Sequence, residues 1–333
     1  MTRLVQIKKG HTRRVALVEE PHLRLLGGCS CIYSLASTAM AGGMKLPETA
    51  RQRITQDVLN YDSIYNGTSE WRLLPSIDHP EDPARCLVSG TGLTHLGSAR
   101  DRQNMHSAAE EVLTDSMKMF RWGLEGGRPN DDAVGIAPEW FYKGNGIMLR
   151  AHADALDWPA YAEDGGEEGE IAGVYIIDPS GNPMRIGMTT GNEFSDHRFE
   201  KKNYLNLAGS KLRNCAIGPE LVIDSPFQSI AGEVVIERAG KAHWTKQIKT
   251  GEAEMCHSLQ NIEHHHFKFE GHRRPGDVHV HFFGADSLSF GEGIQLTDGD
   301  VMQVRFEGFG RALRNPLRVA KNNSALVRVQ SLG

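Results

Sequence analysis

The chain of 333 residues lacks the features that mark several large protein classes. No stretch approaches the ~18 consecutive apolar residues that a membrane-spanning helix needs, so we expect no membrane partner. The first residues carry charge without an apolar region behind them, which predicts a cytoplasmic protein without a secretory signal. Neither a G-x-G-x-x-G motif after a predicted strand nor a G-x-x-x-x-G-K-[ST] motif occurs, so nucleotide binding by those routes has no support.

Cysteine is scarce, and the charge is close to balanced. The chain has an odd number of cysteines and no C-x-x-C motif, so we expect reduced thiols at Cys29, Cys31, Cys86, Cys215 and Cys256. The net charge of −5 argues against a nucleic-acid partner. An apolar content of 39% with little charge bias excludes a disordered chain.

Two parts of the chain differ in texture. Residues 46–60 and 106–122 place apolar side chains on one helical face, which predicts two helices. Beyond residue 127, short β-rich segments alternate with turn residues, which favours an α+β, β-rich fold over a doubly wound sheet. These segments are 146–150, 170–177, 220–223, 232–237, 277–283 and 301–306. We place a smaller N-terminal domain at 1–85 and a main domain at 86–333.

Three acidic residues form the first candidate site. Glu168 and Glu170 are two apart at the start of a predicted strand, so their carboxylates project from the same face. Two like charges on a half-buried face repel each other unless a cation or protons lie between them, and Mg²⁺ is the usual hard cation. Glu193 lies one hairpin downstream and can supply a third carboxylate. An exposed acidic strand end and a solvated loop are the alternatives.

Lysines and histidines supply further candidates. Lys143 and Lys211 each lie among apolar, aromatic or small residues, which is typical of an anion partner or a base. A metal role is not favoured for residues 264–266, because adjacent side chains diverge, nor for His279 and His281. No G-x-S-x-G motif anchors a Ser-His-Asp triad.

Taken in order, these segments resemble the motifs of the fumarylacetoacetate hydrolase superfamily. The matching segments are Pro138-Glu-Trp-Phe-Tyr-Lys143, Glu168-x-Glu170, Gly191-Asn-Glu-Phe-Ser195, Gly209-Ser-Lys211 and Ile217-Gly-Pro219, followed by Arg274-Pro-Gly-Asp-Val278, Asp298-Gly-Asp300, Phe306-Glu-Gly-Phe-Gly310 and Asn315-Pro316. They span residues 90–320. The resemblance implies a β-sandwich roll behind a variable N-terminal domain, and a homodimer.

The resemblance also implies a metal and a substrate class. Glu168, Glu170 and Glu193 would bind Mg²⁺, with Mn²⁺ as an alternative, although Glu193 stands where Asp is usual. The Arg that usually follows four residues later is displaced: His197 holds that place and Arg198 comes next. Members of the superfamily act on small 2-oxo acids, whose keto and carboxylate oxygens bind the cation.

Residues 92–102 and 203–207 resemble the branch of 2-keto-3-deoxypentonate dehydratases, with His95 where Tyr is usual. We therefore expect a Mg²⁺-dependent dehydratase of pentose catabolism that converts a substrate such as 2-keto-3-deoxyarabinonate into 2,5-dioxopentanoate. Lys143 is the first candidate for the base and Lys211 the second, with Glu139 or His106 as the acid. The candidates for substrate binding are Thr94, Ser98, Arg102, Asn192 and Arg198.

Two other functions stay open. The first is hydrolysis of a C–C bond in a 2,4-diketo acid to give pyruvate, for which His106 and Glu110 stand four apart on one predicted helical face. The second is a non-catalytic sugar-acid sensor. The complete set of three carboxylates and two lysines argues against the sensor.

Overall fold

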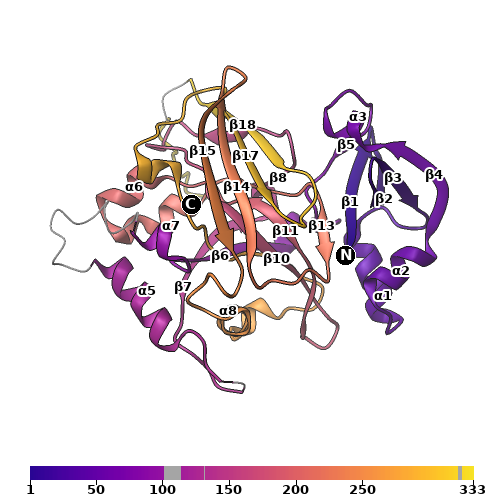
Figure 1. Ribbon diagram of the computed structural model, residues 1–333, viewed down its shortest axis with the longest axis horizontal. Helices are drawn as coiled ribbons and strands as arrows, with labels where there is room; N and C mark the ends of the chain where they lie inside the picture. The colour runs from indigo at the N-terminus through magenta and orange to yellow at the C-terminus, as the bar shows by residue number, and fades with distance from the viewer. Residues whose placement is uncertain (101–113, 131, 322–324) are drawn as a thin grey trace.

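Two β-sheets form the frame of the computed structural model, which describes residues 1–100, 114–130, 132–321 and 325–333 (Figure 1). Within those ranges the larger sheet has 13 strands in the order β4-β3-β2-β1-β13-β11-β10-β16-β6-β7, with β5, β8 and β12 branching off this path. The smaller sheet follows the order β15-β14-β17-β18-β9. The predicted β-rich fold is confirmed.

The strands have the following bounds. The larger sheet contains β1 (Thr2–Lys9), β2 (Thr12–Glu19), β3 (His22–Leu26), β4 (Ile54–Asn60), β5 (Arg72–Leu73), β6 (Cys86–Gly92), β7 (Glu139–Asn145), β8 (Leu149–Arg150), β10 (Gly169–Ile177), β11 (Pro183–Asn192), β12 (Cys215–Ile217), β13 (Leu221–Ile223) and β16 (Val278–Phe282). The smaller sheet contains β9 (Leu156–Trp158), β14 (Ile230–Arg238), β15 (Lys241–Thr250), β17 (Val301–Phe306) and β18 (Leu313–Val319).

Helices are short and lie around the sheets. They are α1 (Ile32–Ala41), α2 (Leu46–Gln52), α3 (Tyr61–Tyr65), α5 (Asp115–Gly126), α6 (His197–Lys202), α7 (Leu207–Lys211) and α8 (Leu259–Phe267), with 3₁₀ turns η1 (Pro83–Arg85), η2 (Gly146–Met148), η3 (Tyr204–Asn206), η4 (Glu270–His272) and η5 (Ser289–Glu292). None of the described helices combines the length and the apolar character needed to cross a bilayer. All five cysteines lie within the described ranges and are free.

The helix predicted over 46–60 is wrong in its second half. Helix α2 ends at Gln52, and the chain then forms β4, which pairs antiparallel with β3. Ile54 and Val58, which the helical pattern assigned to a buried stripe, are exposed on this strand. The β-branched residues of 54–58 tolerate the extended backbone, and the backbone of β3 supplies the hydrogen bonds.

Two further segments differ from their predictions. The predicted helix 106–122 is observed as α5 from Asp115, capped by Thr114, and continues to Gly126, while residues 101–113 lie outside the described ranges. The predicted strand 146–150 is a 3₁₀ turn followed by the two-residue strand β8. The other five predicted strands are observed as β10, β13, β14, β16 and β17.

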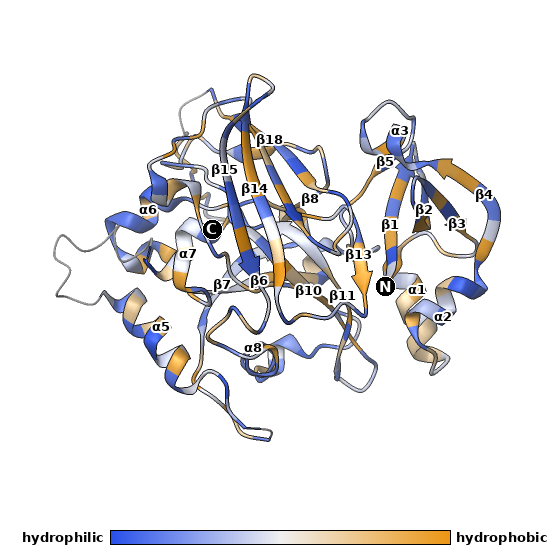
Figure 2. Cartoon of the chain, viewed as in Figure 1, coloured by the Kyte–Doolittle hydropathy of each residue, from blue (hydrophilic) through white to orange (hydrophobic). Residues whose placement is uncertain are grey.

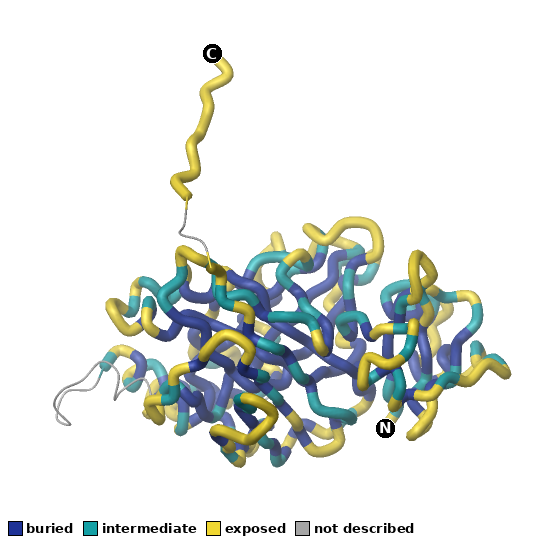
Figure 3. Tube along the Cα trace, turned by 90° about the horizontal axis from the view of Figure 1, so that it is seen from above, coloured by how far each residue is buried: buried dark blue, intermediate teal, exposed yellow. Residues whose placement is uncertain are grey.

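The hydrophobic core has two main parts. One lies between the larger sheet and helices α1 and α2, and the other joins the two sheets, where Ile171 and Met188 pack with Val234 and Val304. Hydrophobic and hydrophilic bands alternate along several strands in Figure 2, as expected for strands with one face toward the core. The central strands are buried, whereas residues 325–333 extend away and are exposed (Figure 3).

The N-terminal segment continues the main sheet. Strand β1 pairs antiparallel with β13, so that Thr2 faces Ile223 and Leu4 faces Leu221. Buried Glu220, directly before β13, forms an ion pair with Arg3 at 3.0 Å and accepts a hydrogen bond from Tyr61 at 3.0 Å. The larger sheet thus crosses residue 85, and the domain boundary there stays a prediction.

Candidate metal centre

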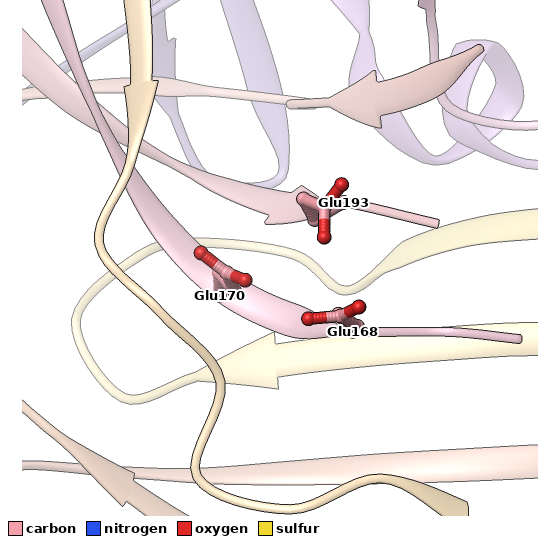
Figure 4. Close-up of side chains that lie close together, drawn as sticks. All are labelled: Glu168, Glu170 and Glu193. Carbon is pink, nitrogen blue, oxygen red and sulfur yellow. The ribbon is translucent and has the colours of Figure 1, made fainter. Parts of the chain in front are cut away.

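Three glutamates meet at one end of the β10–β11 hairpin. Glu168 precedes β10, Glu170 is the second residue of that strand, and Glu193 directly follows β11 (Figure 4). Antiparallel pairing places Glu170 opposite Gly191, which brings the end of β11 beside the start of β10. One carboxylate oxygen from each glutamate lies within 4.8 Å of the other two, and all three residues are buried. The predicted proximity of the three acids is confirmed.

Backbone contacts hold this junction. The amide of Glu193 donates to the carbonyl of Glu168 at 2.9 Å, and Gly166 pairs with Ser195. Phe194, directly after Glu193, has a φ of 42°, so the chain turns sharply there. In Figure 4 the Glu193 carboxylate lies next to those of Glu168 and Glu170.

Asn192, which the sequence proposed for substrate binding, contacts protein atoms on both sides. Its Oδ1 accepts a hydrogen bond from the amide of Glu168 at 3.3 Å, and its Nδ2 lies 3.7 Å from Sδ of Met302 on β17. The buried amide therefore joins the two sheets beneath the acidic cluster. A contact with substrate stays a prediction.

Both predicted lysines reach the acids. Lys143, on β7, places its Nζ 2.5 Å from Glu193 and donates to the carbonyl of Phe194 at 2.7 Å. Lys211, at the end of α7, places its Nζ 2.5 Å from both Glu168 and Glu193. Both lysine side chains are fully buried. Three carboxylates and two ammonium groups leave an excess of one negative charge.

Burial shapes the ionisation of these groups. Desolvation raises the pKa of Glu170 well above its usual value, and the charges of Glu193 and Glu168 raise it further. Desolvation also raises the pKa of Glu193 and lowers the pKa of Lys143. Converging, buried carboxylate oxygens with excess negative charge are the donor set that a hard divalent cation such as Mg²⁺ or Mn²⁺ prefers. The residues present therefore fit the metal that the resemblance implies.

His197, not Arg198, contacts the acidic cluster. Nε2 of His197 lies 3.1 Å from Oε1 of Glu168, and the ring packs against Gly166, where a Cβ would lie 2.4 Å from Nδ1. Burial opposes protonation, but the hydrogen bond and charge of Glu168 raise the pKa of His197. Arg198 is exposed on the first turn of α6. The position that usually carries Arg thus holds a histidine that orients Glu168.

The other predicted residues are either buried or lie outside the described ranges. Glu139 is buried on β7 and accepts a hydrogen bond from Tyr204 at 2.7 Å. Thr94 and Ser98 are both buried, and Ser98 donates to the carbonyl of His95 at 3.2 Å. Arg102, His106 and Glu110 lie in 101–113, outside the described residues.

Two contacts with the acids had no assignment from the sequence. Ser195 donates to Glu193 at 2.9 Å and receives a hydrogen bond from Lys211 at 3.0 Å. The amide of Gly284 donates to Oε2 of Glu170 at 2.6 Å. Ser195 stands within a recognised motif and could have been found there. The Gly284 contact leaves no side-chain signal, because a backbone amide makes it.

The histidine clusters do not compete with this site. Among the described residues, the glutamate triad is the only group of three or more His, Cys, Asp or Glu side chains whose ligand atoms converge within 4.8 Å. His266, His279 and His281 instead lie together in the interior, with Nε2 of His266 2.9 Å from Nδ1 of His279.

Comparisons with known proteins agree with the architecture. No family model matches the sequence, and no curated protein does either. Solved structures do match. A 2-keto-3-deoxy-D-arabinonate dehydratase in its apo form aligns with a TM-score of 0.70 at 18% identity, over 96% of this chain and 100% of that one. The same dehydratase complexed with magnesium and 2,5-dioxopentanoate aligns with a TM-score of 0.69 at 18% identity and the same coverage.

A second enzyme aligns at lower similarity. The 2-hydroxyhepta-2,4-diene-1,7-dioate isomerase from Mycobacterium marinum gives a TM-score of 0.57 at 17% identity, over 97% of this chain and 100% of that one. These alignments cover nearly the whole chain. The motifs that contain Lys143, the three glutamates and Lys211 lie on or beside β7, β10, β11 and α7. The chain therefore has the fold of the fumarylacetoacetate hydrolase superfamily, as its motifs predict.

Proposed function

We propose that this protein is a divalent-metal-dependent dehydratase that converts a 2-keto-3-deoxypentonate into 2,5-dioxopentanoate in pentose catabolism. The observation that carries the proposal is the convergence of three buried glutamates with Lys143 and Lys211. The fold shared with a dehydratase that binds magnesium and 2,5-dioxopentanoate supports it.

The charge of the site suits an anionic substrate. A bound divalent cation, held by Glu168, Glu170 and Glu193, would polarise the carboxylate and 2-oxo oxygens of such a substrate. Adding two positive charges raises the formal charge of the acids and lysines from minus one to plus one with both lysines protonated, and from minus two to zero with Lys143 neutral. The buried side chains of the cluster then attract and orient a carboxylate, with little competition from water.

Lys143 is the better candidate for the base. Desolvation lowers the pKa of Lys143, so its amine loses its proton more readily. Its Nζ contacts one carboxylate, of Glu193, and one carbonyl, of Phe194. Lys211 contacts two carboxylates, which favour its ammonium form. We therefore assign removal of a C3 proton to Nζ of Lys143 and charge stabilisation to Lys211.

Departure of the C4 hydroxyl needs a proton donor. Glu139 and Lys143 are both buried on β7, four residues apart. We assign proton donation to Glu139, in contact with Tyr204. Lys143 takes the C3 proton, the C3–C4 double bond forms, and the C4 hydroxyl leaves as water. The resulting enone rearranges through its enol to the C5 aldehyde.

The test is product analysis by mass spectrometry. The purified protein is incubated with Mg²⁺ and with the D and L forms of 2-keto-3-deoxypentonate in separate tubes. We expect loss of one water from one enantiomer, blocked by EDTA and by Glu170→Gln. A parallel tube holds a 2,4-diketo-3-deoxypentonate. Pyruvate from that tube, with no dehydration in the others, would replace the dehydratase with a C–C hydrolase.

A further inference from the structure

We propose that Thr94 and His95 are positioning residues for Glu170, acting through the peptide that joins Phe283 to Gly284. This inference rests on the proposed metal centre. It assigns Thr94 a different task from the substrate contact that its motif suggests.

We call the chain of hydrogen bonds from Glu170 through the Phe283–Gly284 peptide to Thr94 and His95 the relay. Its first link is the amide of Gly284. It donates to Oε2 of Glu170 at 2.6 Å in the protein interior. Gly284 follows Phe283 just after β16, the strand that pairs with β10. A short hydrogen bond to a carboxylate is stronger than a neutral one, and it fixes one oxygen of Glu170. The second oxygen is left for the acidic cluster.

The second link is the hydroxyl of Thr94. Its Oγ1 donates to the carbonyl of Phe283 at 2.8 Å. This carbonyl belongs to the same peptide as the Gly284 N–H that donates to Glu170, so Thr94 fixes the orientation of that peptide. Gly284 has a φ of 98°, and a Cβ there would lie 2.0 Å from Oγ1 of Thr94 and 3.0 Å from the carbonyl of Thr91. The peptide can take this orientation because residue 284 is glycine.

The third link is His95, which forms the second hydrogen bond to the Thr94 hydroxyl. Because the only proton of that hydroxyl goes to Phe283, Nδ1 of His95 must donate to Oγ1 of Thr94, at 2.8 Å. Nε2 of His95 then accepts from the hydroxyl of Thr250 at 3.2 Å. Thr94, His95 and Thr250 are all buried, and burial lowers the pKa of His95 to about 4. A neutral imidazole offers the one donor and one acceptor that the relay uses.

These contacts restrict the rotation of the Glu170 carboxylate. A side chain with one oxygen held by a fixed amide loses little rotational freedom when its other oxygen binds a cation. Because the Thr94 proton is committed to a buried carbonyl, this hydroxyl has no donor left for substrate. Removing it frees the Phe283–Gly284 peptide and with it Glu170.

The experiment compares Mg²⁺ affinities of full-length variants by titration calorimetry, a measurement that needs no substrate. Thr94→Val keeps the shape and removes the hydroxyl, and Thr94→Ser keeps the hydroxyl. We expect Thr94→Val to weaken Mg²⁺ binding by roughly 10-fold or more, in the range found for partners of metal ligands, and Thr94→Ser to restore it.

Thr189→Val is the matched control. Thr189 is equally buried, and its hydroxyl donates to the carbonyl of Glu220 at 2.8 Å, away from Glu170. This variant loses the same kind of bond and should keep the wild-type affinity. His95→Phe removes the third link while Thr94 keeps its bond to Phe283, so we expect a smaller loss. His95→Phe also serves as the test if Thr94→Val does not fold.

The outcomes separate the two proposals. If the wild-type protein and Glu170→Gln bind Mg²⁺ equally weakly, the metal centre itself fails. If the wild type binds Mg²⁺ and Thr94→Val or His95→Phe binds it as tightly, the relay is overturned. Equal losses in Thr94→Val and Thr189→Val would also overturn the relay, because they would reflect general destabilisation.

Discussion

At the scale of single residues, the two buried lysines differ in what surrounds them. Lys143 contacts one carboxylate and one carbonyl, whereas Lys211 lies between two carboxylates and 4.7 Å from the centre of the Phe141 ring. The second carboxylate favours the ammonium form of Lys211. Because Lys143 contacts one carboxylate rather than two, we propose it as the base. The same residue type at the same depth thus has two different electrostatic surroundings, which is the basis for that proposal.

Replacing Lys143 by Met tests the assignment of the base. Lys143→Met removes the amine but keeps an unbranched side chain of similar length. We expect turnover to fall by roughly 100-fold or more, since general bases contribute about that much, while Mg²⁺ binding persists. Steady-state kinetics and calorimetry measure the two quantities. Lys201→Met, at an exposed position, is the control, and full turnover in Lys143→Met would remove this lysine from the chemistry.

At the scale of elements, the start of β10, where Glu168 and Glu170 lie, packs very close to the second sheet. Gly169 separates Glu168 from Glu170, and a Cβ at this glycine would lie 2.7 Å from Val234 and 3.2 Å from Val304. The missing side chain lets β14 and β17 approach the strand that carries the acids. Close packing of the two sheets therefore depends on this glycine.

Gly169→Ala should consequently destabilise the fold. The added methyl group must displace valine side chains in a packed interior, and we expect a loss of about 1–3 kcal/mol in the free energy of unfolding. Urea unfolding monitored by tryptophan fluorescence measures it. Gly271→Ala adds the same methyl group where no atom lies within 4 Å, and it should change stability by less than about 0.5 kcal/mol. Equal stabilities of the two variants would contradict the packing argument.

At the scale of the whole molecule, buried histidines link β6, β7, β16 and α8. The indole of Trp140 donates to Nδ1 of His266 at 3.2 Å, so the proton of a neutral His266 lies on Nε2 and is donated to His279. His281 lies between the hydroxyls of Ser89 and Thr91, at 2.9 and 2.7 Å. Burial lowers the pKa of both His279 and His281 to about 3. Both imidazoles are therefore neutral in the folded protein near neutral pH.

These pKa values predict acid sensitivity with a defined sign. Unfolded His281 takes up a proton near pH 6.5, whereas the folded protein keeps this imidazole neutral down to about pH 3. Its contribution to stability is complete above pH 6.5 and falls by about 1.4 kcal/mol per pH unit below it. In urea unfolding between pH 6 and pH 5, His281→Gln should reduce the slope of stability against pH by about that amount. His11→Gln, at an exposed side chain, should leave the slope unchanged, and an unchanged slope in His281→Gln would contradict the assignment.

Local sequence patterns were enough for five of the six predicted strands and for bringing the three acids together. Alternation at Glu168 and Glu170 sets both carboxylates on one face, and a single hairpin turn returns Glu193 beside them, so these relations need only neighbouring residues. The burial of Lys143 and Lys211 followed from their apolar surroundings for the same reason. Contacts set by short stretches of chain are readable from short stretches of sequence.

The tertiary structure decided what depends on distant backbone. Residues 54–60 form a strand because β3 offers a partner, which outweighs their helical spacing. His197 rather than Arg198 meets Glu168 because α6 places His197 in the interior and leaves Arg198 exposed. Thr94 contacts the peptide that reaches Glu170 from a position 189 residues away. The sequence by itself determined which residues carry charge and which alternate. Only folding decided which hydrogen-bond partners they meet, because those partners are backbone groups that every residue possesses.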